Sequence, residues 1–152
     1  MTYDCIMGVD PGASGAIAFL YTKYPEIVSV YDAPIVGKEI NPSALCDIIK
    51  QHSPQLVVIE SVHAFKGQGV SSSFTFGQSF GTVLGVIGAL KIPVVRTSPQ
   101  KWKKYFGLDA DKEKARALAI SKWPGVDHFR RKCDHNRAEA ALLAFYGSKT
   151  QG

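Results

Sequence analysis

Short apolar runs alternate along this chain with segments in which apolar residues recur at helical spacing. The runs are rich in Val, Ile, Leu and aromatic residues and are bounded by Gly, Pro or acidic residues, as β-strands are. The run at 56–60 is apolar until its last residue, which is typical of a strand covered on both faces. The pattern predicts strands over residues 3–9, 16–21, 26–33, 56–60 and 92–96.

Helical spacing and capping residues predict helices over 42–51, 76–90, 99–106, 111–122 and 136–146, with Asn41 or Ser43 capping the first and a polar loop over 61–75. The first three strands form an antiparallel meander, and alternating elements follow. The expected fold is therefore α/β, a five-stranded mixed sheet of antiparallel meander plus parallel strands, flanked by helices. No linker or repeat divides the chain, so residues 1–152 are expected to form one domain.

Acidic residues stand where predicted strands end or where the last predicted helix begins. Asp10 closes the first strand and precedes Pro-Gly, Glu60 closes the fourth, and Asp134 and Glu139 flank the start of the last helix. A carboxylate after four apolar residues is not needed for packing. Carboxylates that converge repel one another unless a cation joins them. The alternatives are ordinary ones: a turn-forming Asp10, a surface Glu60 and an N-cap Asp134.

The composition is that of a globular domain: 152 residues, 45% hydrophobic and 20% charged. No apolar run is long enough to span a membrane, and the N-terminus resembles neither a signal peptide nor a clear transit peptide. The three cysteines lack CxxC spacing, so neither zinc nor a disulfide framework is expected, and Cys5 and Cys46 are expected to be buried. We expect a cytoplasmic, DNA-associated protein in a reducing compartment; an organelle stays open.

Basic residues concentrate in the C-terminal half and are interleaved with aromatic residues, and the net charge is +5. That pattern indicates a footprint on a phosphate backbone, although a solvated helical face would look similar. An acidic cluster in a basic protein suggests metal-assisted hydrolysis of a polyanion. The candidate DNA-binding residues are Lys101, Lys103, Lys104, Lys114, Arg116, Arg130 and Arg131, with Phe65 and Lys66 in the loop after Glu60.

Four blocks, in order, resemble those of RuvC-type Holliday-junction resolvases, and most of all the compact phage and organellar branch. They are Gly8-Val9-Asp10-Pro11-Gly12, Val58-Ile59-Glu60, Phe76-Gly77-Gln78-Ser79-Phe80-Gly81 and Arg137-Ala138-Glu139-Ala140-Ala141-Leu142. The resemblance spans nearly the whole chain. It implies a ribonuclease H-like fold with the first and fourth strands side by side, which brings Asp10 and Glu60 together.

The resemblance also implies the site. Asp10, Glu60, Asp134 and Glu139 would hold two Mg²⁺ ions, for which Mn²⁺ would substitute, and Lys112 would steady transition-state charge. The chain departs from relatives with two Asp three residues apart, because Asn136 stands at that spacing. His135, four residues before Glu139, therefore stays a candidate ligand or proton-transfer group.

The implied activity is resolution of four-way junctions by paired symmetric nicks, leaving 5′-phosphate and 3′-hydroxyl ends. The implied partners are junction DNA and a second copy of the chain, with no membrane and no nucleotide cofactor. Glycines 77, 81, 85 and 88 leave one helix face open to close approach, either at a dimer interface or against the sheet. The alternatives are a branched-DNA nuclease of looser specificity, a non-catalytic junction-binding protein and a sugar- or acetate-kinase-like ATPase, although such kinases are usually far longer.

Overall fold

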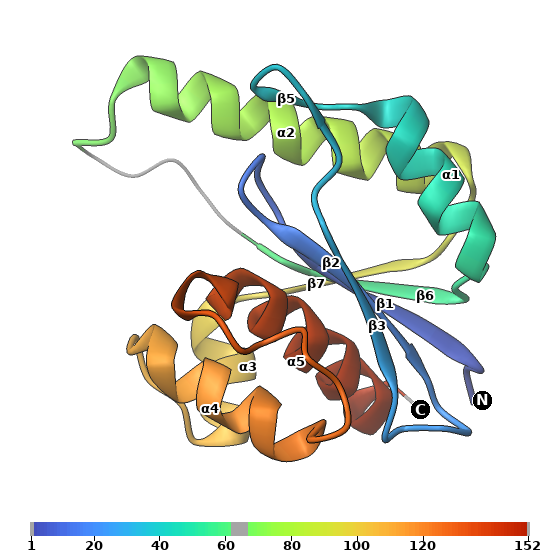
Figure 1. The fold of residues 1–152 in the computed structure, drawn as a ribbon. Helices are drawn as coiled ribbons and strands as arrows, with labels where there is room; N and C mark the ends of the chain where they lie inside the picture. Colours follow the sequence, from blue (N-terminus) through green and yellow to red (C-terminus); the bar gives the residue numbers. More distant parts are fainter. Residues whose placement is uncertain (1, 62–66, 152) are drawn as a thin grey trace.

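The computed structural model describes residues 2–61 and 67–151, and its centre is a twisted sheet in the strand order β3-β2-β1-β6-β7 (Figure 1). The strands are β1 (Cys5–Asp10), β2 (Ala16–Tyr21), β3 (Val28–Asp32), β6 (Leu56–Glu60) and β7 (Val94–Thr97). β1 pairs antiparallel with β2 and β2 with β3, whereas β1–β6 and β6–β7 are parallel. The predicted mixed sheet is confirmed.

The helices form a layer on each side of the sheet. Figure 1 shows α1 (Pro42–His52) and α2 (Val70–Ala89) over one face and α3 (Pro99–Phe106), α4 (Lys112–Lys122) and α5 (His135–Thr150) over the other. Adjacent strand residues supply the two cores because side chains alternate along a strand. Ile6 and Val58 pack with α5, whereas Met7 and Val57 pack with the α1 and α2 residues.

Helix α5 packs very closely against the central strands. A Cβ placed on Gly8 of β1 would lie 2.0 Å from the carbonyl oxygen of Ala140, and one on Gly147 would lie 2.5 Å from the Val58 side chain. Glycine is therefore required at both positions for the backbones to approach this closely. These contacts at Gly8 and Gly147, called the seam below, fix the distance between α5, which carries Glu139, and β1, which carries Asp10.

Local capping agrees with the sequence at two helices. Asn41 caps α1 by accepting hydrogen bonds from the N–H groups of Ser43 and Ala44, at 3.1 and 3.2 Å. Ser98 caps α3 by accepting from the N–H of Lys101 at 3.2 Å. These bonds satisfy donors that the first turn of a helix leaves free.

Several boundaries differ from the prediction. α2 begins at Val70, so the predicted loop over 61–75 is wrong for its last six residues, 70–75. This first part of α2 faces solvent, with Val70 88% and Phe74 72% exposed, so burial gave no periodic signal there. The short hairpin of β4 (Ile35–Val36) and β5 (Glu39–Ile40), and the 3-10 turn η1 (Lys132–Asp134), were not predicted.

Of the two cysteines expected to be buried, Cys5 is buried, whereas Cys46 is only half-buried on α1. Among the residues that the structure describes, no helix combines the length and apolar character that crossing a bilayer requires.

Candidate active site

Three of the predicted carboxylates act on one another at the carboxyl-terminal ends of β1 and β6. The parallel register pairs Val9 with Ile59, so Asp10 and Glu60 follow at the same edge of the sheet. Burial is the largest cause that raises the pKa of Asp10 well above its ordinary value, and the charges of Glu139 and Glu60 raise it further. The seam between α5 and β1 places Glu139 beside the two strand ends, where its side chain is 4% exposed.

Two oxygen atoms of this cluster are buried without a hydrogen-bond partner: Oδ2 of Asp10 and Oε1 of Glu139. Such atoms are costly unless a donor or a cation satisfies them. Within 2–61 and 67–151 no group of three or more His, Cys, Asp or Glu residues stands close enough to be a ready-made metal site, as expected of carboxylates that repel one another. The donor set is all oxygen, which suits Mg²⁺. The residues therefore fit a divalent cation that would draw them together.

Two lysines also lie close to Glu139. Nζ of Lys112 is 3.6 Å and Nζ of Lys103 is 3.9 Å from Oε1 of Glu139, both beyond hydrogen-bond distance. Their positive charges lower the pKa values of Asp10 and Glu60 and so oppose the effect of burial. Lys112 opens α4 and is half-exposed, which leaves its ammonium free to meet an anion from solvent.

Glu60 is held by a buried tryptophan of α3. Nε1–H of Trp102 donates a hydrogen bond of 2.7 Å to Oε2 of Glu60. Burial raises the pKa of Glu60 and this hydrogen bond lowers it, with the charge of Glu139 adding a smaller upward effect. Helical spacing signals that Trp102 is buried; nothing in the sequence signals its acceptor.

Asp134 has other partners than the cluster. Its buried carboxylate accepts bonds from the N–H of Arg131 at 2.8 Å and from Nη2 of Arg131 at 2.9 Å, and Nη1 of Arg137 lies 3.8 Å away. These groups hold the pKa of Asp134 below its ordinary value although burial opposes them. Asp134 occupies the N-cap position of α5, as the N-cap alternative predicted, but its side chain makes no capping hydrogen bond to the helix.

His135 and Asn136 open α5 one turn before Glu139. Helix α5 starts at His135, one residue before the predicted start, so the spacing of four residues puts His135 on the same helix face as Glu139. Nδ1 of His135 is buried without a partner. Nδ2 of Asn136 donates a bond of 2.7 Å to the carbonyl oxygen of Ser14, which ties α5 to the loop that follows Asp10.

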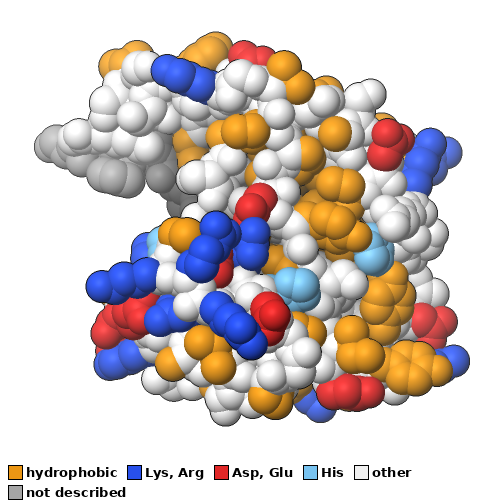
Figure 2. All heavy atoms as spheres, in the orientation of Figure 1, with side chains coloured by type: hydrophobic (Ala, Val, Ile, Leu, Met, Phe, Trp, Pro, Cys, Tyr) orange, Lys and Arg blue, Asp and Glu red, His pale blue; other side chains and the backbone are white. Residues whose placement is uncertain are grey.

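The remaining predicted DNA-binding residues fall into two groups. Lys101 and Lys104 are exposed on α3, and Lys104 lines an open hollow with Lys103 and Gln100. The others are engaged within the protein: Lys114 pairs with Asp109, Arg130 with Asp127 and Arg131 with Asp134. Figure 2 shows the basic side chains gathered over the region of α3, α4 and the start of α5, beside a hollow below α2. The candidates Phe65 and Lys66 lie outside the described residues.

Arg116 is the most fully engaged of this group. It pairs with Glu113 and donates from Nη1 to the carbonyl oxygens of Phe129, at 3.0 Å, and Arg130, at 2.9 Å. Its guanidinium therefore ties α4 to the segment before α5, and it could contact DNA only by giving up these bonds.

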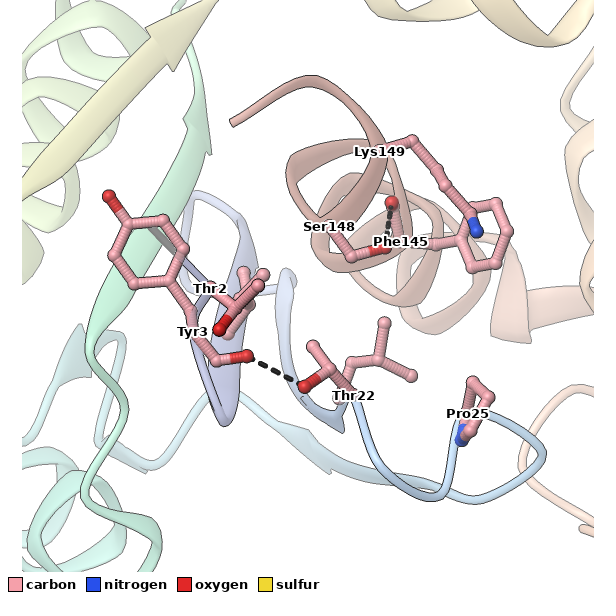
Figure 3. Close-up of a pocket in the computed structure, with 9 residues that line it drawn as sticks. Thr2, Tyr3, Thr22, Pro25, Phe145, Ser148 and Lys149 are labelled. Carbon is pink, nitrogen blue, oxygen red and sulfur yellow. Dashed lines mark hydrogen bonds between the residues drawn. The ribbon is translucent and has the colours of Figure 1, made fainter. Parts of the chain in front are cut away.

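Two other hollows lie on the surface of the described residues, one next to the site and one away from it. A groove of about 550 Å³ lies between the loop after Asp10, the β4–β5 hairpin and the first turns of α2, lined by Ser14, Lys38 and Phe76 among others. The pocket in Figure 3, about 170 Å³, lies at the opposite end of β1. Two of its hydroxyl groups donate inside the protein, Thr22 to the carbonyl of Tyr3 and Ser148 to that of Phe145, and none of the predicted site residues lines it.

No protein-family model matches the sequence, and no curated protein matches it. Solved structures do. Thermus thermophilus RuvC in complex with a Holliday junction substrate is similar over 95% of this chain and 92% of its own, at 17% identity and a TM-score of 0.68. The yeast mitochondrial Holliday junction resolvase Ydc2 matches at 16% identity, 94% and 76% coverage and a TM-score of 0.54. Fowlpox virus resolvase with its junction DNA matches at 12% identity, 97% and 98% coverage and a TM-score of 0.52.

At these identities the likeness establishes the fold. The chain has the ribonuclease H-like fold of RuvC and other Holliday-junction resolvases, as the sequence predicted.

Proposed function

We propose that this protein is a structure-specific DNA endonuclease that resolves four-way junctions by paired symmetric nicks. The observation that carries the proposal is the convergence of Asp10, Glu60 and Glu139 at one sheet edge, with two buried oxygens unsatisfied and two lysines close by. The likeness to resolvases solved with junction DNA supports the choice of substrate. Asp134, by contrast, has both carboxylate oxygens bonded to Arg131.

The residues divide the work by charge. Asp10, Glu60 and Glu139 would hold two Mg²⁺ ions, or Mn²⁺ in their place, which when bound supply an activated water and stabilise the leaving 3′ oxygen. Lys112 and Lys103 lie where their ammonium groups would meet the oxygens of the scissile phosphate. Cleavage of the bond between the phosphorus and the 3′ oxygen would leave 5′-phosphate and 3′-hydroxyl ends.

Four further residues take supporting roles in this proposal. Lys101 and Lys104 extend the positive surface along α3, where the DNA backbone would lie. Asp134 organises Arg131 and Arg137 at the start of α5 rather than binding metal. His135 stays a candidate for proton transfer because its Nδ1 is unsatisfied beside the site.

A homodimer completes the proposal because two nicks need two sites. The glycines of α2 at 77, 81, 85 and 88 are exposed, and a Cβ on any of them would meet no atom within 4 Å. The alternative that these glycines pack against the sheet is therefore wrong for the described residues; Val83 and Ile87 form the buried face instead. An open glycine face on a long helix is suited to close approach by a second copy.

The test is incubation of a labelled four-way junction, and of a linear duplex of the same sequence, with and without Mg²⁺. Paired nicks confined to the junction support the proposal. Nicks on flaps and forks as well would favour the looser branched-DNA nuclease, and binding without nicks would favour a non-catalytic protein. Glu60→Gln should abolish nicking yet leave junction binding intact, since the basic surface is unchanged; loss of binding would mean that Glu60 is structural.

A further inference from the structure

Trp102 joins the acidic and basic sides of the site through one buried side chain. The indole is 0% exposed, and its Nε1–H donates to Oε2 of Glu60 at 2.7 Å. Its ring lies 5.6 Å from Nζ of Lys103, within the range of a cation–π contact. Lys103 in turn reaches Glu139. One ring therefore touches a predicted metal ligand at its edge and a predicted phosphate-binding lysine at its face.

The chain contains a natural comparison, because it has two tryptophans and both are buried. Nε1–H of Trp123 donates to the backbone carbonyl of Pro25 at 2.9 Å, the ordinary solution for a buried indole. A tryptophan kept only for packing needs no more than that. Trp102 instead uses a carboxylate that is itself half-buried.

We infer that Trp102 is a positioning residue for the cation site: it fixes the orientation of the Glu60 carboxylate and the place of Lys103. The inference rests on the proposed function. Glu60 is the last residue of β6, and its side chain would otherwise rotate freely. With Oε2 held by the indole, Oε1 is left to meet the cation. Groups that orient metal ligands in this way typically contribute ten- to a hundredfold to metal affinity.

The experiment compares Trp102→Phe with Trp123→Phe. Both variants lose an indole N–H in the same core, and only the first loses the bond to Glu60. Trp102→Phe should raise the Mg²⁺ concentration for half-maximal single-turnover nicking by about ten- to a hundredfold, with the rate recovering at high Mg²⁺. The Mn²⁺ concentration that gives half of the metal-induced rise in Tm should move by the same factor. Trp123→Phe should move neither.

A second measurement needs no variant of Trp102. The two indole N–H groups give two resonances in ¹⁵N-labelled wild-type protein, and Trp123→Phe assigns them by removing one. Titration with Mg²⁺ should shift the Trp102 resonance and leave the Trp123 resonance in place.

The outcomes separate the two proposals. Equal metal midpoints in the two variants, or an unmoved Trp102 resonance, would overturn the positioning role while wild-type nicking keeps the proposed function. A wild-type protein with neither Mg²⁺-dependent nicking nor a Mn²⁺-dependent Tm would overturn both.

Discussion

Replacing Asp10 by Asn should make the protein more stable while it destroys nicking. The raised pKa of Asp10 means that ionising its carboxyl costs more free energy in the folded state than in the unfolded state. At neutral pH this cost lowers the stability of the fold. Asn is neutral and nearly isosteric, and its NH₂ group can donate to a neighbouring carboxylate. The change removes a buried unsatisfied oxygen and one of three like charges.

The size of the effect follows from the unsatisfied atom. An uncompensated buried acceptor costs about 1–3 kcal/mol. In a domain of this size 1 kcal/mol corresponds to about 2–4 °C in Tm, so Asp10→Asn should raise Tm by about 2–12 °C in EDTA. The gain should shrink or reverse when Mg²⁺ is added, because only the wild type retains its full set of ligands.

Asp134→Asn is the matched control, because Asp134 is buried too but fully paired. Asp134→Asn loses charge-assisted bonds to Arg131, so its free energy of unfolding should fall by about 1–2 kcal/mol and its Tm should fall with it. Its nicking should keep the Mg²⁺ dependence of the wild type. Differential scanning calorimetry of the wild type and the two variants, with EDTA and with Mg²⁺, measures the changes in Tm, and the junction-nicking assay measures the Mg²⁺ dependence.

A lower Tm for Asp10→Asn in EDTA would refute the reasoning, because it would mean that the Asp10 carboxylate is already satisfied. Abolished nicking in Asp134→Asn, with the fold intact, would return Asp134 to the set of metal ligands.

Three further predictions concern other parts of the molecule. Lys112→Met should lower the single-turnover nicking rate about a hundredfold, whereas Lys114→Met, whose ammonium pairs with Asp109, should change it little; equal losses would remove the special role of Lys112. Gly81→Leu should leave the protomer folded, since a side chain there meets open space, but should give a monomer in sedimentation equilibrium where the wild type gives a dimer; an unchanged mass would place the interface elsewhere. Burial lowers the pKa of His52 below its ordinary value of 6.5, so the folded state binds fewer protons than the unfolded state, and stability from this group should be lost as pH falls below that value. Urea unfolding across this range should show a shallower pH dependence in His52→Gln, and identical slopes would contradict the assignment.

The parts of the fold that depend on alternation and burial could be predicted from the sequence. β2 and α3 match their predicted ranges, and the parallel pairing that brings Asp10 to Glu60 is the one implied by the resemblance to RuvC-type resolvases. The start of α2 could not be predicted, because its exposed first turns leave no apolar periodicity. The β4–β5 hairpin is two residues long on each side and carries no strand pattern.

The candidate site was predictable as residue types but not as partnerships. Asp134 and Glu139 look alike in the sequence, five residues apart at one helix start. Only the three-dimensional neighbours separate them: arginines meet Asp134, and carboxylates and lysines meet Glu139. Arg116 shows the same limit, because its guanidinium turns inward to backbone oxygens that sequence spacing does not reveal.

The glycine contacts between α5 and the central strands have a mechanical consequence. With no side chain between the two backbones at Gly8, the strand that carries Asp10 and the helix that carries Glu139 are in direct backbone contact, which leaves little room for one to shift against the other. If the proposed substrate requires the site to adjust, we expect the adjustment in exposed side chains such as Lys112 rather than at this backbone contact. A single methyl group at Gly8 would clash with the backbone of α5 and force the helix away from β1, which would separate Glu139 from Asp10.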